Sequence, residues 1–252
     1  MNKLYPSRGG PRIGVLVPFT NTNLEADLNL MRPPGVSFHS SRMGGYDIDA
    51  VPDAEQMARL GASDLDGPLE LLVGTRPDLI MYGCTSATLT HGVEFDRDLA
   101  QRIHAMSGAQ TVTAAGALVF ALQAIGAKRI AFASPYTSDI NQAGIAFLQD
   151  SGFEVVSSAA IEEDLGNYGQ AELTPDDVFD LGLSAVEGGA DALVLSCTEM
   201  RSVEAITRLE DKLGIPVITS NQAMMFEAMS RLSMPTGEVP FGRLFSQGPA
   251  NG

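Results

Sequence analysis

Two cysteines, Cys84 and Cys197, are the residues whose type and spacing most clearly suggest chemistry in this chain. Segment 77–87 reads PDLIMYGCTSA and segment 190–200 reads ADALVLSCTEM, so in both an aspartate precedes an apolar run, a small residue and Cys-Thr. The thiolate is the reactive form of cysteine and acts as a nucleophile or a proton carrier. Two opposed thiols suit proton removal and return on opposite faces of a carbon, or attack by one with proton transfer by the other.

The elements that must position these cysteines are two buried strands, because short apolar runs bounded by turn residues are typical of parallel sheets. Each cysteine is then expected just past the carboxyl end of its strand, where open α/β sheets have their active sites. Thr85 and Ser86 follow the first cysteine and Thr198 follows the second. These polar residues predict a turn into a helix, whose backbone N–H groups stabilise a thiolate or a carboxylate. A single cysteine is about as often a small core residue, but recurrence at equivalent points argues for function.

A long-period repeat supports two similar halves. Segment 12–20 matches segment 129–137, Cys84-Thr85 matches Cys197-Thr198, and 111–113 matches 217–219, all in the same order. Strands and helices alternate regularly, which predicts parallel sheets covered on both faces. We therefore expect two facing α/β lobes. The first comprises residues 11–112 with 219–246 and the second residues 113–218, with soft boundaries because the helix after each last strand can belong to the opposite lobe.

The individual elements follow from apolar periodicity and from turn residues. The expected strands are 12–18, 36–43, 79–82, 110–113, 128–134, 154–158, 192–195 and 216–220. The expected helices begin at 24 and cover 54–73, 96–106, 114–125, 138–151, 175–187, 203–213 and 221–230. Thr22 or Asn23 is the expected cap of the first helix, and Met57 and Leu60 are among the expected core contacts of the second.

Charge and composition exclude several classes of function. The formal net charge of −15 argues against nucleic acid and anionic membrane surfaces, which require basic patches. No apolar run approaches the roughly 20 residues that span a bilayer. The first ten residues lack an apolar signal-peptide core, so the cytoplasm is the expected compartment, where free thiols are commoner than disulfides. Without CxxC, HExxH, phosphate-loop or GxGxxG motifs, we expect neither a metal nor a cofactor.

Three further polar residues are candidates for binding a substrate. Asn21 follows the proline that ends the first strand, and its amide can donate to a carboxylate, although asparagine is also common in turns. Tyr136 has the equivalent place in the second half, with packing as the alternative role. Asn167 lies in a glycine-flanked loop. Other polar residues are interpreted as structural or as ordinary surface residues: His39, His91, Arg42, Arg76 and Arg201.

Taken in order, these segments resemble the aspartate/glutamate racemase superfamily, and most closely its maleate cis-trans isomerase branch. The resemblance extends from about Arg12 to Phe245. It rests on the following pieces: VPFTNT at 17–22 with Glu25, PGVSFH at 34–39 with Arg42-Met43, GCTSA at 83–87, SPY at 134–136, Asn167, SCTEMR at 196–201 and SNQA at 220–223.

The resemblance implies two pseudo-symmetric Rossmann-like lobes, a site between them, no cofactor, a small dicarboxylate substrate and a homodimer. Cys84 matches the thiolate that adds to the double bond of maleate. The bond that becomes single then rotates, and elimination of the thiolate releases fumarate. Cys197 matches the group that transfers a proton or stabilises the enolate-like intermediate. Asn21, Tyr136 and Asn167 match binders of the substrate carboxylates. Backbone N–H groups after each cysteine, at Thr85, Ser86 and Thr198, would help as an oxyanion site.

Alternatives remain open at this point. Arylmalonate decarboxylases share the fold but have glycine at the first cysteine position, so Cys84 disfavours decarboxylation. Racemases of amino acids or hydantoins keep both cysteines and are the main alternative; the VPFTNT loop, Tyr136 and Asn167 favour the isomerase. Phe19 departs from the family pattern, where a small polar residue is more usual, and Met224 and Met225 can alter the pocket. A two-lobed binding protein without catalysis has no need for matched cysteines.

Overall fold

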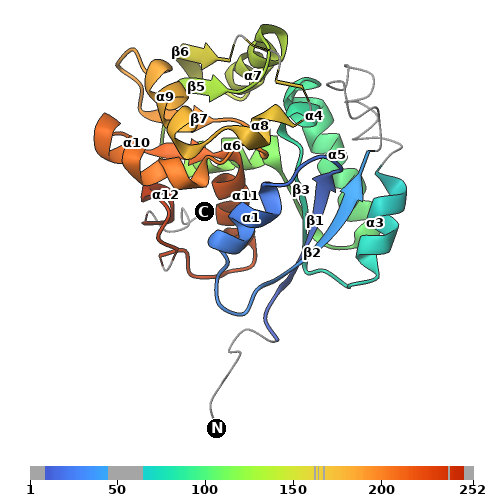
Figure 1. Cartoon of the computed structure of the whole chain (residues 1–252). Helices are drawn as coiled ribbons and strands as arrows, with labels where there is room; N and C mark the ends of the chain where they lie inside the picture. The colour runs from blue at the N-terminus through green and yellow to red at the C-terminus, as the bar shows by residue number, and fades with distance from the viewer. Residues whose placement is uncertain are drawn as a thin grey trace.

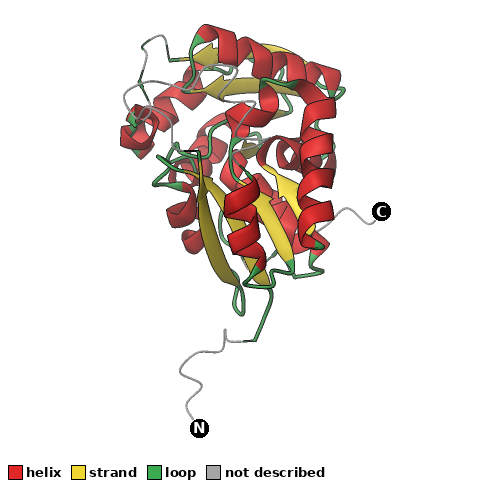
Figure 2. Ribbon diagram, turned by 90° about the vertical axis from the view of Figure 1, so that its right-hand side faces the viewer, coloured by secondary structure: helices red, strands yellow, loops and turns green. Residues whose placement is uncertain are grey.

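The computed structural model shows an α/β fold with two parallel sheets, which confirms the predicted fold class (Figure 1). It describes residues 9–44, 65–161, 163, 165–166, 168–237 and 239–246. Figure 2 shows one sheet above the other, each flanked by helices. Within the described ranges, no helix has the length and apolar character needed to cross a membrane.

The two sheets have the same strand order, which confirms the repeat seen in the sequence. The first sheet has the order β2-β1-β3-β4 and the second the order β6-β5-β7-β8. Their strands are β1 (Arg12–Pro18), β2 (Ser37–Met43), β3 (Leu79–Tyr82), β4 (Gln110–Thr113), β5 (Arg129–Ser134), β6 (Glu154–Ala160), β7 (Ala192–Leu195) and β8 (Val217–Thr219). All pairings are parallel. Each cysteine strand, β3 or β7, is therefore central in its sheet.

Helices connect the strands. They are α1 (Leu24–Leu30), α3 (Asp66–Val73), α4 (Thr85–Leu89), α5 (Gly92–Ser107), α6 (Ala114–Ala124), α7 (Ser138–Asp150), α8 (Gly169–Glu172), α9 (Pro175–Ser184), α10 (Ile206–Leu213), α11 (Ser220–Arg231) and α12 (Arg243–Ser246). Residues 54–64 of the second expected helix, with Met57 and Leu60, lie outside the described residues. The helix expected at 96–106 begins earlier, at Gly92.

The aspartate that opens each cysteine segment has a structural role. Asp78 Oδ2 accepts a hydrogen bond from the backbone N–H of Arg12 at 2.8 Å. Its counterpart Asp191 accepts from the N–H groups of Lys128 and Arg129 at 2.9 and 2.8 Å. In each half the carboxylate thus ties the start of the cysteine strand to the start of its neighbour, and it fixes the register of β3 on β1 and of β7 on β5.

The helix after the last strand of each sheet reaches the other sheet. Helices α6 and α11 pack against one another; α6 contacts β8, and α11 contacts β3 and β4 (Figure 1). Equivalent threonines cap both helices: Thr113 accepts from Gly116 N at 3.1 Å and Thr219 from Gln222 N at 3.2 Å. One hydrophobic cluster runs through both halves and includes these two helices, and a second cluster lies within the first half, around Leu69, Tyr82 and Leu99. The lobe boundaries at 112 and 218 stay a prediction.

Candidate active site

Both cysteines lie two residues beyond the ends of their strands and are buried, with 6% of Cys84 and 4% of Cys197 exposed. Both are free thiols. The loops that carry them meet across the two halves, because Thr198 Oγ1 donates to the carbonyl oxygen of Gly83 at 3.0 Å. The predicted convergence of the two thiol segments is therefore present in the structure.

Cys84 lies at the N-terminal cap of α4, with an extended backbone (φ −127°, ψ 105°). The backbone N–H groups of Ser86 and Ala87 are hydrogen-bonded to its thiol, and Ser86 Oγ is 3.6 Å from Sγ. Burial raises the pKa of the Cys84 thiol above its usual value, while the donors of Ala87 and Ser86 oppose that shift. The first turn of α4 thus supplies the N–H donors that a thiolate requires.

Gly83 allows the first cysteine loop to reach this position. A Cβ atom on Gly83 would lie 2.3 Å from Leu24 Cδ2 and 3.0 Å from the Leu16 carbonyl oxygen. Leu24 and Leu16 are completely buried, so neither neighbour has room to move. The small residue before Cys84 in the sequence pattern is therefore dictated by the close approach of β3 to α1 and β1.

Cys197 is separated from the helix expected at 203–213 by a longer turn than the one after Cys84. Residues 198–200 form bends, and the helix begins as a 3-10 turn at Val203 that continues into α10. The physical reason is that Thr198 turns toward the first lobe, where it bonds Gly83 and Asn21. The backbone N–H of Glu199 nevertheless donates to Cys197 Sγ at 3.4 Å. Burial raises the pKa of the Cys197 thiol to about 12, against hydrogen bonds from Tyr136, Glu199 and Met200.

Tyr136 interacts with both thiols. Its hydroxyl is hydrogen-bonded to Cys197, and negative charge on either thiol disfavours ionisation of the phenol. Burial is the largest cause that raises the pKa of Tyr136 well above 10, so the phenol remains a proton-bearing donor at neutral pH. Ser134 supports the loop, because its Oγ accepts from Tyr136 N at 3.5 Å and donates to Asn141 Oδ1 at 2.7 Å.

Asn21 is buried beside the second cysteine loop, with its Nδ2 donating to Thr198 Oγ1 at 3.1 Å. Its Oδ1 accepts from the N–H groups of Asn23 and Leu24 at 3.1 and 2.9 Å. Asn23, one of the two expected residues, occupies the cap position of α1 but makes no side-chain cap bond; the Asn21 amide oxygen accepts from the first N–H groups of the helix instead. Because the cap fixes the amide oxygen, the Nδ2 group is directed toward the cysteine loops.

The threonines after the cysteines bond to segments that are distant in the sequence. Thr85 Oγ1 donates to Ser220 Oγ at 3.2 Å, at the start of α11, much as Thr198 bridges to Gly83 and Asn21. The Thr198 hydroxyl thus joins the two predicted lobes, and the Thr85 hydroxyl ties the first cysteine loop to the start of α11. A substrate role for the N–H groups of Thr85, Ser86 and Thr198 stays a prediction, and Asn167 lies outside the described residues.

The residues interpreted as structural have ordinary partners. Arg42 is hydrogen-bonded to Glu25 and to the carbonyl oxygens of Pro18 and Asn21. Arg201 pairs with Glu204 at 2.9 and 3.0 Å. The remaining three lie in polar or exposed surroundings: His39 near Ser37 Oγ, His91 near Thr90 Oγ1, and Arg76 on the surface.

Sequence reasoning missed a group of buried acids and amides around the cysteine loops. Asn221 Nδ2 donates to Asp27 Oδ2 at 2.7 Å and to the Thr198 carbonyl oxygen at 3.0 Å. Asp27 and Glu199 are also buried, and burial raises the pKa of each carboxyl to about 7. The signal for Asp27 was a charged residue on the apolar face of α1, between Leu24 and Leu28. The chain has 31 acidic residues, so spacing alone did not single out Glu199.

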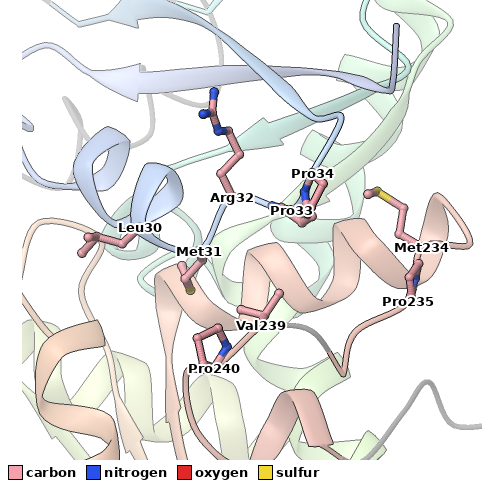
Figure 3. A pocket seen from close by; sticks show the side chains of 9 residues that line it. All are labelled: Leu30, Met31, Arg32, Pro33, Pro34, Met234, Pro235, Val239 and Pro240. Carbon is pink, nitrogen blue, oxygen red and sulfur yellow. The ribbon is translucent and has the colours of Figure 1, made fainter. Parts of the chain in front are cut away.

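Two further observations concern metal binding and the cavities of the molecule. Among the described residues, no group of three His, Cys, Asp or Glu side chains could hold a metal ion. A separate surface cavity of about 150 Å³ lies where the end of α1 meets the segment after α11, lined largely by apolar side chains such as Met31, Met234 and Val239 (Figure 3). It contains neither cysteine. The polar groups gathered around the cysteine loops are two buried thiols, a phenol, amide donors and two buried acids.

Comparison with known proteins agrees with this arrangement. A family model described as arylmalonate decarboxylase matches residues 69–245. Maleate isomerase from Pseudomonas putida KT2440 is 30% identical over 247 residues, covering 93% of this chain and 94% of that protein. The chain belongs to the family of arylmalonate decarboxylases and maleate isomerases.

Solved structures of isomerases from this family are similar to the chain. The maleate isomerase Iso from Pseudomonas putida S16 has a TM-score of 0.86 at 29% identity, covering 94% of this chain and 98% of that one. A Nocardia farcinica maleate cis-trans isomerase variant with a covalently bound succinylcysteine intermediate has a TM-score of 0.86 at 27% identity, with coverages of 95% and 99%. These relatives identify the chain as an enzyme of the isomerase class and confirm the resemblance seen in its sequence.

Proposed function

We propose that this enzyme converts maleate, or a similar cis-unsaturated dicarboxylate, to the trans isomer by reversible addition of the Cys84 thiolate, without a cofactor. The observation that carries the proposal is the pairing of two buried thiols, at equivalent points of two equivalent sheets, with the Tyr136 phenol bonded to Cys197 and within the electrostatic influence of Cys84. A related isomerase structure with a succinylcysteine intermediate supports a covalent route.

The reaction needs no redox partner. The Cys84 sulfur forms a bond to one alkene carbon, and the π electron pair moves to the neighbouring carbon and its carboxylate. The former double bond is then single and rotates. Cleavage of the S–C bond returns the electron pair to the carbon–carbon bond and regenerates the thiolate.

The surroundings of the thiols suit these steps. The N–H groups of Ser86 and Ala87 offset the burial that disfavours the Cys84 thiolate. Cys197 stays protonated because its pKa is raised to about 12, so it can share its proton with the developing carbanion and take it back on elimination. Tyr136, whose pKa is also raised, can donate a hydrogen bond to the charge that develops on the carboxylate.

An experiment in D₂O distinguishes this reaction from the racemase alternative, because a racemase must exchange the α-proton of its substrate with solvent deuterium. Purified protein, kept reduced, is incubated with maleate in D₂O and followed by proton NMR. We expect the olefinic signal of fumarate to replace that of maleate. Absence of fumarate, together with α-proton exchange of an amino acid or hydantoin, would replace this proposal with two-base racemisation.

A further inference from the structure

Glu199 is a buried acid beside both thiols to which the reaction above gives no role. Only 8% of the residue is exposed, and its carboxyl accepts a hydrogen bond from the backbone N–H of Thr22. Its Oε1 atom is buried and has no hydrogen-bond partner among the residues that the structure describes. A buried, unpartnered carboxylate oxygen is unfavourable unless it becomes protonated or meets a donor. This geometry favours the neutral acid.

The groups that face Glu199 leave its charge largely uncompensated. A charge on Glu199 raises the pKa of Cys84, Cys197 and Tyr136, so its carboxyl lies near all three. Thiols and phenols are either neutral or negatively charged, so none of the three supplies a positive charge. Arg42 is the cation that acts on Glu199, and its guanidinium is already bonded to Glu25 and to two backbone carbonyl oxygens.

A dicarboxylate would bring two more negative charges to this place. An ionised Glu199 would repel it, whereas a protonated carboxyl can donate a hydrogen bond to it. We propose that Glu199 binds the substrate as a neutral acid, taking up a solvent proton when the dicarboxylate enters and donating Oε1–H to a substrate carboxylate. The inference rests on the proposed function, since it names the protonation state in which that site holds its substrate. No covalent bond to the substrate is made or broken in this step.

The pH dependence follows from the pKa of Glu199, which burial raises to about 7. Below that pH the acid is already protonated, and above it binding must include proton uptake. At pH 8 about 0.9 proton is taken up, and the Kd for a dianion rises about fivefold between pH 7 and pH 8. The other acid with a pKa raised to about 7, Asp27, faces Asn221, Arg201 and Glu204 instead.

The test uses succinate, an unreactive dicarboxylate, and isothermal calorimetry at pH 8 in two buffers with different ionisation enthalpies. Wild-type protein should take up about 0.9 proton per succinate bound. Glu199→Gln keeps a donor without a titrating group, so its uptake should fall to near zero and its Kd should not change between pH 7 and pH 8. The exposed Glu187→Gln serves as a charge-matched control and should behave like the wild type.

Three results would overturn the inference: no proton uptake in the wild type, undiminished uptake in Glu199→Gln, or loss of uptake in Asp27→Asn while Glu199→Gln retains it. None of these readouts requires turnover. Failure of the proposed function, seen as no fumarate from maleate, is therefore distinguishable from failure of this inference, seen as dicarboxylate binding without proton uptake.

Discussion

Replacing Gly83 with alanine tests the link between packing and chemistry in one position. The new Cβ atom would lie 2.3 Å from Leu24 Cδ2 and 3.0 Å from the Leu16 carbonyl oxygen. Carbon atoms at optimal separation are about 3.5–4.0 Å apart, so the chain must move by more than about 1 Å to relieve the first contact. Leu24 is completely buried, and the second contact is to backbone. The strain therefore falls on the loop that carries Cys84.

Two effects of Gly83→Ala should be measurable together. Overpacking of this kind costs about 1–3 kcal/mol of stability, which for a chain of this size lowers Tm by about 2–4 °C per kcal/mol. A displacement of about 1 Å at the nucleophile costs about 100-fold in rate. Thermal unfolding and the initial rate of maleate isomerisation give the two numbers.

Gly237→Ala is the matched control, because no atom of the described residues lies within 4 Å of its Cβ position and its backbone φ is not in the left-handed region. It should change neither stability nor rate appreciably. A Gly83→Ala protein as stable and as active as this control would refute the reasoning that the close approach of β3 to α1 positions the nucleophile.

Three further changes probe the site. Tyr136→Phe removes the hydroxyl bonded to Cys197 and should lower kcat by about 10- to 100-fold with little change in Tm; an unchanged kcat would exclude the phenol from the reaction. Thr198→Val removes the hydroxyl that joins Asn21 to the first cysteine loop and should cost about 1–3 kcal/mol in urea unfolding. Asp27 has a folded pKa raised to about 7, so the unfolded chain binds fewer protons between about pH 4 and 7 and stability falls as pH rises through that window. Asp27→Asn should reduce this fall, measured as the urea midpoint at pH 5 and pH 8, whereas an unchanged slope would contradict the shift.

The repeat made much of the fold predictable. Matching Arg12 with Arg129 and Cys84 with Cys197 predicted two equivalent sheets, and the strand orders confirm this. Asp78 and Asp191 show why the pattern recurs, since both tie neighbouring strands at the same point. A local interaction of this kind depends on residue type and spacing, and sequence alone records both.

The contacts between the halves were less predictable, because they depend on how two lobes meet. Thr198 turns toward Asn21 and Gly83, so the chain after Cys197 forms bends before the helix that begins at Val203, whereas α4 follows Cys84 directly. The hydrogen bond between Asn221 and Asp27 likewise joins residues far apart in the sequence. Glu199 was visible beside Cys197, but its burial and its unpartnered oxygen arise from three-dimensional packing.

The most direct test of the central claim is proton NMR of maleate incubated with wild-type protein and with Cys84→Ala under reducing conditions. The account predicts fumarate from the wild type and none above background from Cys84→Ala, with both proteins showing the same circular dichroism spectrum. Fumarate formed by Cys84→Ala at the wild-type rate would contradict thiolate addition by Cys84. A wild-type protein that forms no fumarate would contradict the proposed reaction itself.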